Sequence, residues 1–124
     1  MSVITEMLSA KGEKVKKRNS INFQLKEANA FIMEILSFVA SQKGTVIQDF
    51  YVGTTNDINM RLFKGHKVNA QENRFVSFEA SINPVADEVV YQLREMGMNG
   101  YLQRNSGQFV YCYLIGDRTV EWSN

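Results

Sequence analysis

One short stretch of this chain combines three side chains that could recognise a phosphate. It runs from Tyr51 to His66 and reads Y-V-G-T-T-N-D-I-N-M-R-L-F-K-G-H. The pattern is typical of a strand end, a glycine, a polar turn and then a helix with Arg61 beside its apolar stripe. This order directs a tyrosine hydroxyl, a guanidinium and an imidazole toward one surface. Because a guanidinium contacts phosphate oxygens in a bidentate manner, the cluster could bind a phosphate group.

Each of these three side chains also has a purely structural interpretation. Tyrosine packs well on the face of a sheet, so Tyr51 can be a packing residue. Arg61 can lie along the surface or pair with Asp57, one turn earlier. His66 can interact with the last carbonyl groups of its helix. The sequence leaves both interpretations open.

Apolar periodicity predicts the elements that must position this stretch. Apolar residues at spacings of three and four predict a first helix, and β-branched and aromatic runs predict strands. Pro84 suits the first position of a third helix, and Gly97 suits its end. The expected elements are helices over 22–42, 56–65 and 84–96, and strands over 45–52, 74–80 and 109–115.

Local chemistry around the first strand sets further expectations. Strand alternation places Tyr51 on the opposite face from Phe50. Gly53 lets the chain turn after the strand without steric cost. Thr55 or Asn56 then caps the second helix. Residues 98–108 are expected to form a polar loop, and residues 117–124 a tail.

Length and composition predict one globular domain. The chain has 124 residues, of which 44% are hydrophobic and 22% are charged, values that exclude a disordered chain. No apolar run is long enough to span a bilayer, and the first ten residues lack the pattern of a signal peptide. Cys112 is the single cysteine, so no internal disulfide is possible. These features favour a cytoplasmic setting.

Charge is unevenly distributed although the net value is only +1. Residues 1–43 are basic, whereas residues 44–124 are slightly acidic. Residues 1–20 are interpreted as a flexible basic arm and residues 21–124 as the folded domain. The basic residues of the arm could contact nucleic-acid phosphates or form a solvated leader, and the sequence does not choose between the two. They are Lys11, Lys14, Lys16, Lys17 and Arg18.

The stretch that begins at Tyr51 resembles the second half of the GIY-YIG nuclease core. In that family, a Tyr-Ile/Val-Gly strand end precedes a Thr/Asn/Asp-rich turn and a helix that carries an arginine. His66 falls where many members have a histidine. The matching residues are Tyr51, Val52, Gly53, Thr55, Asn56, Asp57, Arg61 and Leu62.

The resemblance implies a fold and a set of roles. The fold is α+β, with a small, mostly antiparallel sheet, here of three strands, flanked by helices. The implied catalytic residues are Tyr51, Arg61 and His66, the implied substrate-binding residues are Gly53, Thr55 and Asn105, and the implied metal ligand is Glu88. The implied cofactor is Mg²⁺ or Mn²⁺, which would polarise the scissile phosphate of DNA.

Two functions follow from this comparison. The first is metal-dependent binding or cleavage of DNA phosphodiesters. The second is an inactive GIY-YIG-like module that acts through protein or nucleic-acid contacts, because no Gly-Ile/Val-Tyr tripeptide precedes Tyr51. A helix register one turn different would also place Val90 or Gln92, rather than Glu88, at the metal position. The apolar face of helix 22–42 could serve a protein partner or a homodimer.

Overall fold

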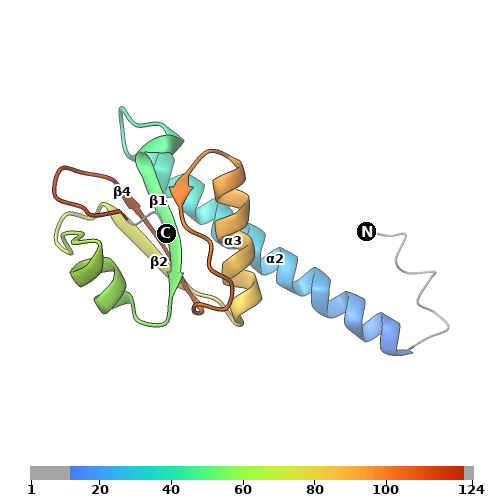
Figure 1. The fold of residues 1–124 in the computed structure, drawn as a ribbon. Coiled ribbons are helices and arrows are strands. Elements are labelled where there is room, and N and C mark those ends of the chain that lie inside the picture. The colour runs from blue at the N-terminus through green and yellow to red at the C-terminus, as the bar shows by residue number, and fades with distance from the viewer. Residues whose placement is uncertain (1–11, 122–124) are drawn as a thin grey trace.

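The computed structural model describes residues 12–121 of the chain, and it confirms an α+β fold (Figure 1). Predicted helices and strands recur in the expected order, with one short strand added. The elements are α2 (Gly12–Ser41), the 3-10 turn η1 (Ile47–Asp49), β1 (Phe50–Thr55), the π-helix η2 (Asn59–Gly65), β2 (Phe75–Glu79), α3 (Asn83–Glu95), β3 (Asn99–Gly100) and β4 (Phe109–Leu114).

The sheet has four strands in the order β2-β4-β1-β3, whereas three were predicted. Strand β4 pairs antiparallel with both β1 and β2, but β3 pairs parallel with β1. The sequence missed β3 because it is only an Asn-Gly pair, which lacks β-branched or aromatic residues. Its pairing depends on backbone groups opposite Tyr51 and Val52. The sheet is therefore mixed rather than uniformly antiparallel.

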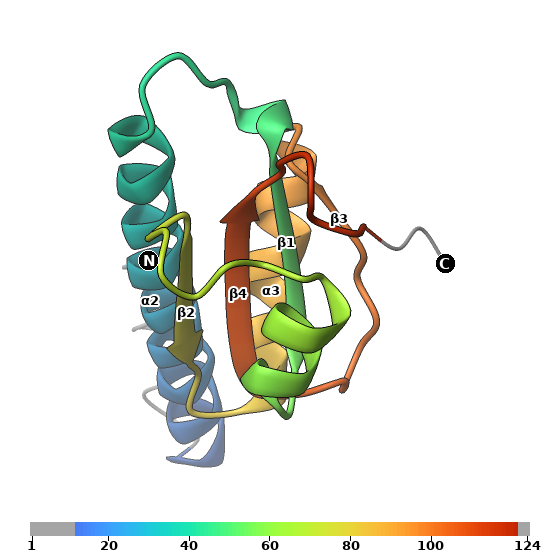
Figure 2. The same ribbon diagram turned by 90° about the vertical axis from the view of Figure 1, so that its left-hand side faces the viewer.

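Helices cover one face of the sheet and η2 covers the other, as the two views in Figures 1 and 2 show. The helical side holds the main core, in which α3 packs on β1 and β4, and α2 packs on α3 and β2. On the η2 side, a smaller cluster surrounds Leu62. Buried members of the main core include Ala28, Ile32, Ile35, Phe50, Val52, Val85, Val89, Val90, Leu93, Val110 and Cys112.

The first strand begins and ends later than the predicted range of 45–52. Its predicted first half is interrupted by η1, where the Val46 amide donates to the Asp49 carboxylate at 2.8 Å and the Asp49 amide donates to the Val46 carbonyl at 2.9 Å. This tight turn uses backbone groups that a strand would need for its ladder. Extended structure therefore starts at Phe50 and reaches Thr55.

Helix α2 begins at Gly12, ten residues before the predicted start at Asn22. Glu, Lys and Arg are good helix formers, and they extend the helix through the predicted basic arm even though few apolar residues occur there. The first eleven residues of that arm lie outside the described residues. None of the helices within residues 12–121 is long and apolar enough to cross a bilayer.

Candidate functional site

Three tyrosines from β1 and β4 lie together on the sheet face beneath η2. Tyr51 pairs with Tyr113 across the antiparallel ladder, and Tyr111 is the next residue of β4 on the same face. The rings of Tyr51 and Tyr113 stack with centroids 5.5 Å apart, and those of Tyr111 and Tyr113 lie 6.4 Å apart. All three are buried. Strand alternation thus presents three phenols to one small region.

Gly53 lies inside β1 rather than in the turn that the sequence predicted. It pairs with Tyr111, whose ring lies directly over it. A Cβ atom at Gly53 would lie only 2.8 Å from Cζ of that ring. The glycine is therefore needed for close approach of a side chain, and not for a backbone turn.

The segment from Thr55 to His66 places the next functional residues over the tyrosines. The Thr55 hydroxyl accepts from the Asp57 amide at 3.0 Å, and the Asp57 carboxylate accepts from the Met60 amide at 3.2 Å. These bonds fix the entry into η2, where sequence analysis expected a cap at Thr55 or Asn56. At the end of η2, the His66 amide donates to the Arg61 carbonyl at 2.9 Å, the spacing of a π-helix.

His66 is fully buried among the tyrosines, and its hydrogen bonds define one tautomer. Its Nδ1 lies 2.6 Å from the Val120 carbonyl oxygen, which can only accept, so Nδ1 carries the proton. Nε2 is then an acceptor, and the Tyr111 hydroxyl donates to it at 2.7 Å. The Tyr113 hydroxyl lies 3.0 Å from Nδ1 and donates to the Glu121 carboxylate at 2.8 Å.

The C-terminal segment closes over this cluster. The Val120 amide donates to the His66 carbonyl at 2.8 Å, while the Val120 carbonyl accepts from the imidazole of the same residue. The carboxylate of Glu121 then accepts from Tyr113. The phenols are thus held between η2, the sheet and the final described residues.

Burial keeps these groups neutral near pH 7. It lowers the pKa of His66, an effect to which the nearby Arg61 charge adds and which the Val120 bond opposes. Burial raises the pKa of Tyr51, Tyr111 and Tyr113, and for Tyr113 the hydrogen bond to Glu121 raises it further. The hydroxyls are therefore hydrogen-bond donors rather than bases at neutral pH.

Arg61 supplies the positive charge of the site. It is exposed on η2, yet a side-chain hydrogen bond links it to Tyr111, and its charge partly opposes the rise that burial causes in the pKa values of Tyr51 and Tyr111. The structure therefore brings together Tyr51, Arg61 and His66, the three residues predicted to be catalytic.

Two other predicted site residues, Glu88 and Asn105, lie elsewhere, whereas Gly53 and Thr55 belong to β1 beside the cluster. Glu88 is on α3, which packs on the opposite face of the sheet from η2, and its carboxylate accepts from the Gln92 amide group at 2.6 Å (Figure 2). Asn105 lies near Glu88, and the backbone amide of Asn105 donates to the Asp87 carboxylate at 3.1 Å. Within residues 12–121, no three His, Cys, Asp or Glu residues lie close enough together to hold a metal ion.

Sequence reasoning missed Tyr111 and Tyr113 as members of the cluster, and it missed the contribution of Val120 and Glu121. The alternation of tyrosines in the Tyr-Cys-Tyr run of β4 was a usable signal, because residues two apart share a strand face. The pairing of β4 with β1, separated by more than fifty residues, was needed to give that signal meaning.

No protein-family model, no curated protein and no solved structure matches this chain.

Proposed function

We propose that this chain is a GIY-YIG-like module that binds the phosphodiester backbone of DNA without cleaving it. The observation that carries the proposal is the placement of Arg61 beside Tyr51 and Tyr111 on one sheet face, with Glu88 on the other. The first half of this observation, Arg61 beside the two tyrosines, favours phosphate recognition. The second half separates Glu88, the predicted metal ligand, from them, and the Glu121 carboxylate that does lie in the cluster already accepts from Tyr113.

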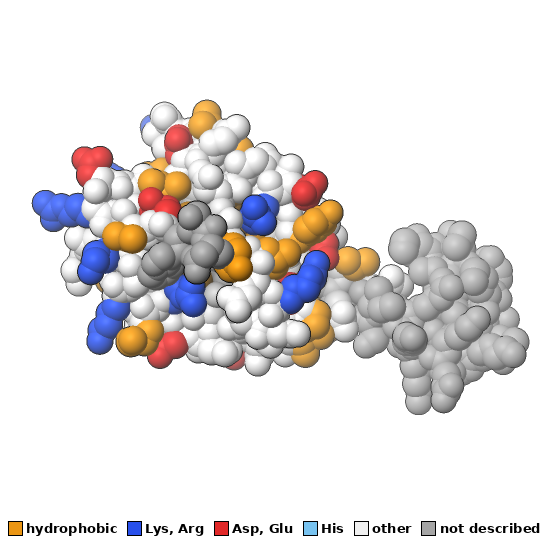
Figure 3. All heavy atoms as spheres, viewed as in Figure 1, with side chains coloured by type: hydrophobic (Ala, Val, Ile, Leu, Met, Phe, Trp, Pro, Cys, Tyr) orange, Lys and Arg blue, Asp and Glu red, His pale blue; other side chains and the backbone are white. Residues whose placement is uncertain are grey.

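Binding is supported by the surface around Arg61. Several Lys and Arg side chains lie over η2 and the loops beside it, interspersed with a few acidic residues (Figure 3). Exposed cations in this region include Lys64 and Lys67 as well as Arg61. Cations on one face contact phosphates without regard to base sequence, and they release counterions as they do so.

Cleavage is disfavoured by the chemistry of the buried cluster. An attacking water needs access and a base, but the hydroxyls of Tyr111 and Tyr113 are bonded to His66 and Glu121 beneath the closing segment. A Mg²⁺ or Mn²⁺ ion at Glu88 would lie across the sheet from Arg61. Nuclease activity with such an ion stays a prediction, which the experiment below tests. A cytoplasmic setting also stays a prediction.

The test combines binding and nicking measurements on the same preparation. Fluorescence anisotropy with a labelled DNA duplex is expected to show binding that weakens with salt, and Arg61→Ala is expected to reduce the affinity about tenfold, the value of a charged hydrogen bond. Arg104→Ala is the matched control, because Arg104 is an exposed arginine beside Glu88 and Asn105.

Plasmid nicking with Mn²⁺ distinguishes the two functions. The proposal expects no nicking by the native protein. Nicking that disappears in both Arg61→Ala and Glu88→Ala would establish the nuclease instead. Equal DNA affinity for native protein and Arg61→Ala would eliminate Arg61 as the phosphate contact.

A further inference from the structure

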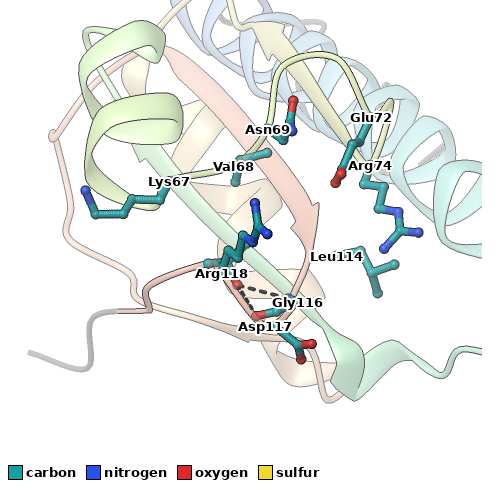
Figure 4. Close-up of a pocket in the computed structure, with 10 residues that line it drawn as sticks. Lys67, Val68, Asn69, Glu72, Arg74, Leu114, Gly116, Asp117 and Arg118 are labelled. Carbon is teal, nitrogen blue, oxygen red and sulfur yellow. Dashed lines mark hydrogen bonds between the residues drawn. The ribbon is translucent and has the colours of Figure 1, made fainter.

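A second cationic region lies apart from Arg61, where two loops border a half-open cavity of about 640 Å³. One wall is the loop from Lys67 to Arg74, between η2 and β2, and the other is the turn from Gly116 to Thr119 after β4 (Figure 4). Arg61 is not among the lining residues. The cavity is therefore a separate feature of the molecule.

Hydrogen bonds hold both walls in place without a ligand. The Thr119 hydroxyl accepts from the Gly116 amide at 2.9 Å and donates to the Gly116 carbonyl at 3.0 Å. On the other wall, the Asn69 side-chain oxygen accepts from the Gln71 amide at 2.9 Å. The Arg74 carbonyl accepts from the Leu114 amide at 2.9 Å, which joins the two walls at the sheet. A cavity with fixed walls loses little entropy when a ligand binds.

Two guanidinium groups border the same space. Arg118 extends into it from the turn, and Arg74 lies on its other side near Leu114 (Figure 4). Neither guanidinium forms a salt bridge with any residue in the described range 12–121. The charge of both arginines is thus available to an anion, and the planar donors of arginine match phosphate oxygens.

The remaining lining residues define the charge of the ligand. Lys67 and Asp117 point away from the space between the arginines, whereas Glu72 points toward it (Figure 4). Counting all lining side chains, three cations face two carboxylates. The two guanidinium groups thus outnumber the one carboxylate that points toward this space, and a phosphate monoester, with about −1.5 to −2 charges near pH 7 and three free oxygens, offers acceptors to both.

We propose that this cavity binds a phosphate monoester through Arg74 and Arg118. Its size falls in the range of small-molecule sites, so it can also admit part of the group that bears the phosphate. Such a monoester can be the terminal phosphate of a nucleic-acid strand or that of a free nucleotide. The proposal goes beyond the proposed binding of the DNA backbone at Arg61, and it does not depend on that binding.

The test is a titration of the full-length protein with inorganic phosphate, followed by NMR chemical shifts at constant ionic strength. Arg74→Ala and Arg118→Ala are each expected to weaken phosphate binding about tenfold, because each removes a charge-assisted hydrogen bond. Glu72→Gln is expected to strengthen binding, since it removes a repulsive charge. A gain of affinity cannot result from misfolding. Arg104→Ala, at another site, is expected to leave it unchanged.

Two further arms identify the source of the phosphate. Tighter binding of a 5′-phosphorylated oligonucleotide than of its 5′-hydroxyl counterpart would support a strand end. Tighter binding of adenosine monophosphate than of inorganic phosphate, with no preference between the oligonucleotides, would support a nucleotide. Phosphate shifts that are equal in native protein, Arg74→Ala and Arg118→Ala would overturn the proposal, as would weaker binding by Glu72→Gln.

Discussion

The contact between Gly53 and Tyr111 shows how one residue type permits the aromatic cluster. A side chain at Gly53 would occupy the space of the phenol ring, and the ring is held by its bond to His66. The tyrosine cannot yield without breaking that hydrogen bond. The small residue in β1 and the large one in β4 are therefore a matched pair.

Gly53→Ala is expected to destabilise the fold by about 1–3 kcal/mol, the usual cost of overpacking a buried contact. Urea unfolding measures the change. Gly116→Ala is the control, because an added Cβ there would meet no atom within 4 Å. Equal destabilisation by both substitutions would show that loss of glycine flexibility, and not contact with Tyr111, is responsible.

His66 predicts a pH dependence of stability. Its pKa is lowered in the folded protein, so the unfolded state, with a value near 6.5, binds more protons as the pH falls. Stability is therefore present above the unfolded pKa, and it decreases as the pH drops below that value toward the folded pKa. Urea unfolding between about pH 7.5 and about pH 5.5 is expected to show this loss, and His66→Gln is expected to show a smaller one. Identical losses of stability in the native protein and in His66→Gln would mean that other titrating groups cause the pH dependence.

At the scale of elements, η2 depends on the turn that precedes it. Seven residues cannot form a stable helix alone, so their position is set by the Asp57 cap and by burial of Leu62 against the sheet. This small element carries Arg61 and leads directly to His66. Its start is therefore a structural requirement of the site.

Asp57→Ala is expected to cost about 1 kcal/mol of stability, the usual value of an N-terminal cap. The Arg61 contribution to DNA binding is expected to fall with it, because the helix start loosens. Unfolding and anisotropy measurements test both effects. Asp117→Ala is the control, since the Asp117 carboxylate has no hydrogen bond within residues 12–121. An unchanged unfolding midpoint in Asp57→Ala would contradict the role of the cap.

At the scale of the whole molecule, the apolar face of α2 is covered, whereas the N-terminal part of the same helix is rich in charged residues. The stripe of α2 that contains Ala28, Ile32 and Ile35 is buried in the main core, so it is not free for a partner. A protein partner or homodimer at residues 22–42 stays a prediction, and it would have to use the exposed Phe23 and Met33 instead. The N-terminal part of α2 carries the basic run.

Replacing Lys14, Lys16, Lys17 and Arg18 together by Gln is expected to weaken DNA binding and to flatten its dependence on salt. Removing one phosphate neutralisation reduces the slope of log affinity against log salt by about 0.9. Anisotropy at several salt concentrations gives this slope. Lys43→Gln, which changes a single exposed lysine just beyond the C-terminal end of α2, is the control. An unchanged slope would favour a solvated leader.

Much of the molecule was predictable from local patterns. The third helix and the strands over 74–80 and 109–115 lie within one residue of their predicted bounds. These elements have strong apolar periodicity, and Pro84 and Gly97 define the ends of the third helix. The late start of β1 was not predictable because the Asp49 carboxylate competes for backbone donors that β-propensity ignores.

The sequence by itself determined the element types, the strand alternation that separates Tyr51 from Phe50, and the placement of Arg61 on a helix directly after Tyr51. These are local properties, set by side chains a few residues apart. Only the tertiary structure decided that Tyr111 and Tyr113 join Tyr51, that Val120 and Glu121 enclose His66, and that Glu88 lies across the sheet. Those contacts join residues far apart in the chain, and their formation depends on strand order and on the packing of whole faces.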